Sequence, residues 1–216
     1  MRRIARLLRI HQITVERKLV FLARQGLLEH QHWMRSAQMQ QIESFQFDEM
    51  ETSEHTKLKP LSIALAVSGK GRKILGFEVS QMPATGHLAS KSLQKYGFRQ
   101  DQRAQGLGLL FQSICRNASS ACLIQSDQKP LYAPMVKKYF PESIHIQHKG
   151  RRGCVVGQGE LKRGGYDPLF VLNHTCAMFR ANVNRLFRRT WCTTKKRERL
   201  TQHLILYMNY HNHVLT

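Results

Sequence analysis

The stretch that decides the fold is FQFDEM, residues 45–50. Phe45 and Phe47 alternate with polar residues, and this period of two is typical of a half-buried β-strand. Asp48 is an acid within a strand that otherwise buries itself. It is either a candidate site residue or an ordinary strand-end aspartate that bonds to a local turn.

Two further apolar runs follow this strand at short intervals. LSIALAV at residues 61–67 and ILGFEV at residues 74–79 have the length and apolar content of strands. SGKG at residues 68–71 supplies turn residues between them. The three segments therefore predict an antiparallel meander.

The second half of the chain alternates helical and extended patterns. Beyond a helix near 104–116, the unbroken apolar run 121–124 predicts a strand covered on both faces. Further on, the patterns predict a helix from Pro130 to about Tyr139, a short strand at 144–146, a helical pattern from Leu169 through Leu186 towards Thr190, and a helix at about 196–212. This order of elements indicates an α/β fold.

Asp127 stands at the carboxyl end of a predicted strand, the usual place for ligands in α/β sheets. If the strand of Asp48 is its neighbour, the two carboxylates converge. Like charges so close need a cation between them, and oxygen ligands favour Mg²⁺ or Mn²⁺ over zinc. Two such ions, about 3.5–4 Å apart, can hold the attacking and leaving oxygens of a phosphodiester. The plainer alternative is that Asp127 caps the helix near Pro130.

The chain is strongly basic, because 34 Lys and Arg residues against 14 Asp and Glu residues give a formal net charge of +20. This excess indicates a polyanionic partner, and nucleic acid is favoured over an anionic membrane. A solvated basic surface without a partner is disfavoured, since uncompensated charge opposes compaction. No apolar run has the length of a membrane span, and the arginine-rich start does not resemble a signal peptide. Five cysteines at irregular spacing are expected to be reduced, intracellular thiols.

Residues 2–26 contain two short helical patterns. Thr14 is expected to cap the second helix, and Gly26 is expected to end it. The second helix carries the basic residues Arg17 and Lys18. This arrangement predicts a helix-turn-helix that enters a major groove, and a plain helical hairpin is the alternative.

Two basic segments are candidates for contact with a DNA backbone. Residues 149–165 resemble a phosphate loop only superficially, because Gly165 and Tyr166 stand where a P-loop has Lys and Ser or Thr. A basic hairpin that grips DNA is the preferred interpretation there, with a surface loop as the alternative. The last helices form the second segment, where a solvated face is the alternative. The candidate residues are Lys149, Arg151, Arg152, Lys162, Arg163, Arg180, Arg185, Arg188 and Arg189.

Several short motifs are specific in combination. They are FDEME at 47–51, SDQKPLY at 126–132, the basic run 180–195 and YMNYHN at 207–212. Together they resemble segments of the bacterial insertion-sequence transposases of the insertion element one type. That family belongs to the DDE transposase and retroviral integrase superfamily. The resemblance covers about residues 1–213.

This resemblance implies a ribonuclease H-like fold, with a mixed five-stranded sheet flanked by helices. It also implies two Mg²⁺ ions and DNA strand transfer, with Asp48 and Asp127 as catalytic metal ligands. The third carboxylate of the family precedes a basic residue by seven positions, and the equivalent position before Arg180 is Asn173. An Asn carbonyl can bind Mg²⁺ but brings no charge, and Glu160 is the fallback ligand.

The expected organisation is a partial helix-turn-helix segment at 1–29, a polar linker or exposed helix at 30–43, and the catalytic domain at 44–216. Such transposases usually carry a zinc-binding cysteine segment before the helix-turn-helix, so the chain is expected to be truncated there. The expected partners are DNA, at the element ends and at the target, and further copies of the chain on DNA, in the cytoplasm at the nucleoid. A catalytically inactive, truncated DNA-binding remnant and a basic RNA-associated protein are the alternatives.

Overall fold

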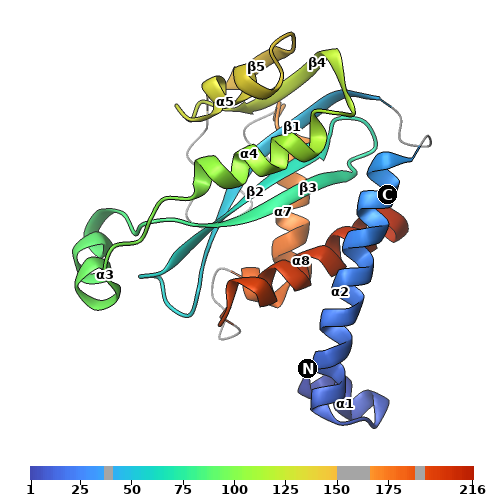
Figure 1. Ribbon diagram of the computed structural model, residues 1–216, viewed down its shortest axis with the longest axis vertical. Helices are drawn as coiled ribbons and strands as arrows, with labels where there is room; N and C mark the ends of the chain where they lie inside the picture. The colour runs from blue at the N-terminus through green and yellow to red at the C-terminus, as the bar shows by residue number, and fades with distance from the viewer. Residues whose placement is uncertain (37–40, 150–165, 188–192) are drawn as a thin grey trace.

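The computed structural model describes residues 1–36, 41–149, 166–187 and 193–216 (Figure 1). Within these residues, no helix is long and apolar enough to span a bilayer. Helices lie on both faces of one central sheet (Figure 1).

The central sheet has five strands. They are β1 (Ile42–Ser53), β2 (Pro60–Ser68), β3 (Ile74–Gln81), β4 (Ala118–Asp127) and β5 (Ile144–His148). Their order is β3-β2-β1-β4-β5, in which β1, β2 and β3 are antiparallel and β4 and β5 run parallel to β1. The predicted meander is therefore confirmed. The expectation that residues 121–124 are covered on both faces is wrong for one face, because Cys122 and Ile124 are buried while Ala121 is exposed and Leu123 is half-buried.

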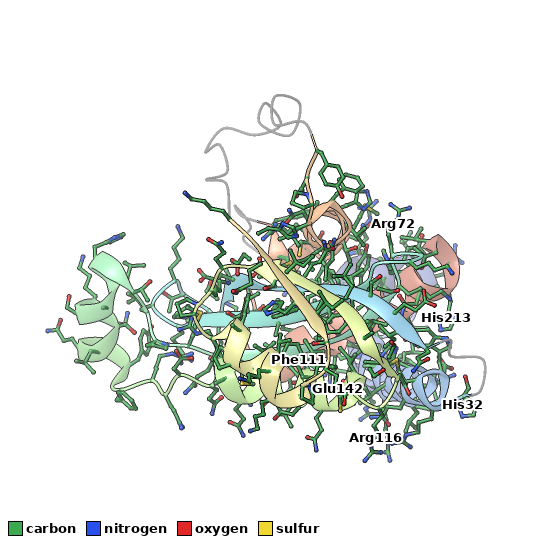
Figure 2. The ribbon with its side chains drawn as sticks, turned by 90° about the horizontal axis from the view of Figure 1, so that it is seen from above. His32, Arg72, Phe111, Arg116, Glu142 and His213 are labelled. Atoms are coloured by element: carbon green, nitrogen blue, oxygen red, sulfur yellow. The ribbon has the colours of Figure 1, made fainter. Side chains whose placement is uncertain are left out.

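The alternation along β1 divides the core between the two faces of the sheet. Phe47 packs edge-on against Phe111 of α4 (Arg103–Ile114), with ring centroids 4.9 Å apart, and α5 (Tyr132–Tyr139) shares this core. Met50 points to the opposite face, where it packs with residues of α7 (Phe170–Asn182) and α8 (Arg197–Tyr210). Seen from above, α7 lies on one side of the sheet and Phe111 on the other (Figure 2). The predicted ribonuclease H-like α/β fold is confirmed.

The helical segment between β3 and α4 was not predicted from sequence. It comprises η1 (Gly86–Leu88) and α3 (Ala89–Tyr96). Ser92 is the one buried residue of α3. The segment therefore lacks the apolar stripe from which a helix is recognised in a sequence.

The first two helices are α1 (Arg2–Leu8) and α2 (Gln12–Arg35). The predicted cap at Thr14 is wrong. His11 caps α2 instead, because a ring nitrogen of His11 accepts a hydrogen bond from the backbone N–H of Ile13 at 3.3 Å. The helix-turn-helix interpretation of these helices stays a prediction.

Gly26 does not end α2, so the predicted end of this helix is wrong. A Cβ atom at Gly26 would lie 2.5 Å from Nδ2 of Asn209 on α8. The same Asn209 amide donates a hydrogen bond to Glu29 at 3.2 Å. The glycine therefore lets α8 approach α2 closely, although in a sequence it resembles a helix end.

The carboxyl-terminal turns of α2 pack against the sheet. His30 is buried, with its Nε2 atom 3.0 Å from the carbonyl oxygen of Leu75. Met34, one turn later, is buried in the core that contains Phe47. Up to Arg35, the segment predicted as a polar linker or exposed helix is thus a packed helix.

The helical pattern from Leu169 ends earlier than predicted. α7 stops at Asn182, where Val183 adopts an extended backbone with φ −106° and ψ 98°, and η2 (Asn184–Leu186) follows. Asn and Val are weak helix formers. Val183 and Leu186 are nevertheless buried. The spacing of the apolar residues therefore indicated which side chains are buried, but not that one helix continues through them.

Asn212→Ala is expected to lower the free energy of unfolding by about 2–4 kcal/mol. The Asn212 side chain accepts a hydrogen bond from the backbone N–H of Ile74 at 2.8 Å and donates one to its carbonyl oxygen at 2.9 Å. The variant leaves both buried backbone groups without this partner. Urea unfolding measures the change, and Asn184→Ala in the exposed part of η2 is the matched control. Equal stability of the two variants would contradict this role of Asn212.

Candidate active site

Asp48 and Asp127 lie on neighbouring strands, Asp48 within β1 and Asp127 at the carboxyl end of β4. β1 and β4 run parallel, and Gln46 is paired with Gln125. The pairing offset is 125 − 46 = 79, and 127 − 48 is also 79, so the same offset places Asp127 opposite Asp48. Residues two apart on a strand share a face, so both acids lie on the face of this glutamine pair. The expectation that their strands are neighbours is confirmed.

Gln46 ties the start of α7 to this face. Its Nε2 atom donates to Oε1 of Gln125 at 2.9 Å and to the carbonyl oxygen of Pro168 at 2.8 Å. Its Oε1 atom accepts from the backbone N–H of Leu172 at 3.0 Å. These bonds satisfy a buried amide and hold α7 over the face that carries Asp48.

The two carboxylates repel each other. Burial raises the pKa of the Asp127 carboxyl, and the charge of Asp48 raises this pKa further. Lys129 acts in the opposite direction, through its charge and its backbone N–H. A cation between the two acids would remove the repulsion.

Lys129 supplies a cation from the chain itself. Its ammonium nitrogen lies 3.0 Å from Oδ1 of Asp48 and 3.6 Å from Oε2 of Glu49. Burial lowers the pKa of the Lys129 ammonium, but Asp48 and Glu49 outweigh burial, and the net effect is a raised pKa. Sequence reasoning missed Lys129 and Glu49 as site residues. The available signal was their place in the quoted motifs, because Glu49 follows Asp48 in FDEME and Lys129 lies two residues after Asp127 in SDQKPLY.

Tyr132 and Ser62 complete the polar surroundings. The Tyr132 hydroxyl donates to Oδ1 of Asp48 at 2.9 Å, and the Ser62 hydroxyl donates to Oε1 of Glu49 at 2.8 Å. Burial, followed by the charges of Asp48 and Glu49, raises the pKa of Tyr132, so its hydroxyl keeps its proton. The sequence did not predict Tyr132 at the site, since its contact with Asp48 depends on how α5 packs.

The plainer alternatives for the two aspartates fit the structure less well. Asp48 lies inside β1, and its bonds go to Lys129 and Tyr132, far along the chain. The Asp127 carboxylate accepts a hydrogen bond from the backbone N–H of Lys129 at 3.2 Å, and this bond closes a local turn. It does not cap α5, where Leu131 occupies the N-cap position without a side-chain bond.

Asn173 lies in the first turn of α7 and is exposed. Its amide nitrogen donates to Oδ2 of Asp167 at 2.9 Å. Among the residues that the structure describes, no hydrogen bond joins Asn173 to Asp48 or Asp127. The fallback ligand, Glu160, lies outside the described residues. The structure therefore brings the two aspartates together and leaves Asn173 paired elsewhere.

The charges of Asp48 and Arg180 both act on Cys176 of α7. Burial raises the pKa of the Cys176 thiol to about 12, with the positive charge of Arg180 opposing this shift and the negative charge of Asp48 adding to it. Such electrostatic effects require proximity. Arg180 is half-buried one turn beyond Cys176 on the same helix.

The donor set suits Mg²⁺ or Mn²⁺ rather than zinc, because Asp48 and Asp127 offer carboxylate oxygens. The ammonium of Lys129 marks a position that already attracts a cation. In the described part of the chain, no group of three or more His, Cys, Asp or Glu side chains is placed to hold a metal. Amide, water or phosphate oxygens would therefore complete the coordination, as Mg²⁺ commonly allows.

The candidate DNA-contacting residues fall in several places. Arg17 and Lys18 are exposed on α2, and Lys149 is exposed directly after β5. The guanidinium of Arg185 donates to the carbonyl oxygen of Thr193 at 3.3 Å. Six others lie outside the described residues, and they are Arg151, Arg152, Lys162, Arg163, Arg188 and Arg189.

No protein-family model matches the chain, and no curated protein matches it. Among solved structures, the chain is similar to one from the simian T-cell lymphotropic virus intasome in complex with PP2A regulatory subunit B56 gamma, determined by cryo-electron microscopy. The sequence identity is 12% and the TM-score is 0.36. The match covers 78% of this chain and 49% of that chain, so this chain spans about half the length of the one it matches. A likeness of this degree assigns no activity.

Asp127→Asn is expected to raise the melting temperature of the metal-free protein at neutral pH. The variant removes a partly desolvated charge beside Asp48 and keeps an oxygen that can accept the Lys129 backbone N–H. A raised pKa means that the folded state binds the Asp127 proton more tightly than the unfolded state. This stabilisation of the wild type is present in acid and is lost as the pH rises through the raised pKa. Melting curves in EDTA from about pH 3 to about pH 8 should therefore show a higher melting temperature for Asp127→Asn than for the wild type only above the pKa of Asp127 in the folded protein.

Asp48→Asn is the contrasting variant in the same melting experiment. It loses the ion pair with Lys129 and weakens the bond from Tyr132, so we expect a loss of about 1 kcal/mol of stability. If both variants changed the melting temperature in the same direction, the electrostatic description of the site would be wrong.

Proposed function

We propose that the protein is a DNA transposase that catalyses metal-dependent strand cleavage and strand transfer of an insertion sequence. The observation that carries this proposal is the placement of Asp48 and Asp127 opposite each other on neighbouring parallel strands. The repulsion between them and the attraction of Lys129 support a cation-binding role. The net charge of +20 supports a polyanionic substrate.

Asp48 and Asp127 would hold the metal, and Asn173 would add a neutral amide oxygen from α7. A metal pair held there would supply charge stabilisation for the attacking and leaving oxygens of a phosphodiester. The protein fixes the two carboxylates through the β1–β4 register, and Gln46 holds α7 beside them. For Asn173 to take part, its amide must leave Asp167.

Basic side chains would position the DNA backbone around this centre. Lys149 directly follows His148, which is paired with Asp127 across β4 and β5, so an exposed ammonium group comes from the edge of the site. Arg180 adds a half-buried cation from α7. Contacts of this kind neutralise phosphates and give DNA binding a steep dependence on salt.

The second candidate function is a catalytically inactive DNA-binding remnant of a transposase. The observation that favours it is Asn173, which is exposed, uncharged and paired with Asp167. Such a protein would bind DNA in a salt-dependent manner. It would not cleave DNA, whichever divalent metal ion is added.

Asp48→Ala and Asp127→Ala are each expected to slow strand cleavage by at least about a hundredfold, because each removes a metal ligand and its charge. Nicking of supercoiled plasmid with Mg²⁺ or Mn²⁺ measures the rate. Asp101→Ala is the matched control, since Asp101 precedes α4 and is paired with Arg103, the first residue of that helix, rather than with the site. Full activity of both site variants would refute the assignment, and no cleavage by the wild type would favour the inactive remnant.

Asn173→Asp is expected to keep or raise the affinity for Mn²⁺, by up to about tenfold, because it adds a charge without changing the shape of the side chain. Electron paramagnetic resonance of free Mn²⁺ measures the binding. Asn184→Asp in η2 adds the same charge on the exposed surface, and we expect it to leave the affinity unchanged. Weaker binding by Asn173→Asp, with Asn184→Asp unaffected, would show that Asn173 is not a ligand.

A further inference from the structure

We infer that Lys129 is a displaceable internal counter-ion of the carboxylate site, so that a divalent metal ion and the Lys129 ammonium compete for Asp48. While no metal is bound, the ammonium balances Asp48 and Glu49. When a metal ion binds Asp48, the ammonium gives way. This inference rests on the metal site of the proposed function and adds a residue that regulates it.

The hydrogen bonds at Asp48 make the two cations competitors for its Oδ1 atom. Oδ1 of Asp48 accepts from the Lys129 ammonium at 3.0 Å and from the Tyr132 hydroxyl at 2.9 Å. A carboxylate oxygen has about two lone-pair sites, so both are in use. A metal ion that binds this oxygen must therefore take the place of one of the two donors.

Lys129 is the donor that leaves more readily. Tyr132 is fully buried in the core beneath the site, and its ring packs 4.7 Å from that of Phe47. The Lys129 side chain is 35% exposed, so its ammonium can move into water. Its backbone stays in place, because the Lys129 N–H is bonded to Asp127 at 3.2 Å.

Glu49 sets the strength of this competition. Its side chain is 3% exposed, and its charge is shared between the Ser62 hydroxyl at 2.8 Å and the Lys129 ammonium at 3.6 Å. A buried carboxylate that loses its cation is unfavourable. Glu49 therefore draws the Lys129 ammonium back whenever the metal leaves, and the pair lowers the apparent affinity of the site for metal.

Neutral variants of Lys129 test this inference through metal binding alone. Lys129→Met is expected to bind Mn²⁺ about tenfold more tightly than the wild type, because one nearby positive charge is gone. Lys129→Gln is expected to behave in the same way, and Lys129→Arg, which keeps the charge, should stay close to the wild type. Lys137→Met is the matched control on the exposed side of α5, and it should leave the affinity unchanged.

Melting temperatures give a second readout. In EDTA, Lys129→Met and Lys129→Gln should melt below the wild type, since Asp48, Glu49 and Asp127 then repel without compensation. Saturating Mg²⁺ should raise their melting temperatures more than that of the wild type. Lys129→Arg should restore the wild-type response.

The failure of this inference can be told apart from the failure of the proposed function. If the wild type binds Mn²⁺ and both neutral variants bind it equally or more weakly, the competition does not exist, but the metal site stands. If neither the wild type nor any Lys129 variant binds Mn²⁺, both the metal site and the competition are refuted.

Discussion

Two carboxylates held opposite each other on parallel strands create an unfavourable interaction that the rest of the site must offset. The β1–β4 register brings Asp48 and Asp127 together, and the bond from Gln46 to Gln125 joins the two strands two residues before the acids. On the other face, Phe47 holds β1 in place by packing against Phe111 of α4. The chain cannot relieve the repulsion without breaking these contacts. A cation is the remaining way to stabilise the arrangement, and Lys129 supplies one while no metal is present.

A site of this kind costs stability that the fold must provide elsewhere. The apolar cores on both faces of the sheet extend to α4, α5, α7 and α8, and α2 adds a further layer through its packing on α8. Asp127 lies where β4 ends, and Asp48 lies opposite it within β1, so both acids are only partly buried. The end of β4 is also where exposed basic residues such as Lys149 leave the sheet. The proposed activity thus joins a negative centre that attracts metal to positive surroundings that attract DNA.

Local patterns predicted the strands well, because the alternation of apolar and polar residues, as in FQFDEM, shows which side chains point to the buried face of a sheet. The convergence of Asp48 and Asp127 was expected only on the condition that their strands are neighbours, and the β1–β4 pairing meets that condition. Gly26 was misread because its close neighbour, Asn209, comes from the far end of the chain. Lys129 and Tyr132 were missed at the site for the same reason, since their bonds to Asp48 exist only once β4 and α5 are packed.

A crystal structure of the protein soaked in Mn²⁺, with anomalous scattering used to locate the ion, tests the central claim most directly. The account predicts an anomalous peak about 2.1–2.3 Å from carboxylate oxygens of both Asp48 and Asp127, with the Lys129 ammonium moved away from Asp48. A peak elsewhere on the molecule, or Asp48 still bonded to Lys129 at saturating Mn²⁺, would contradict it.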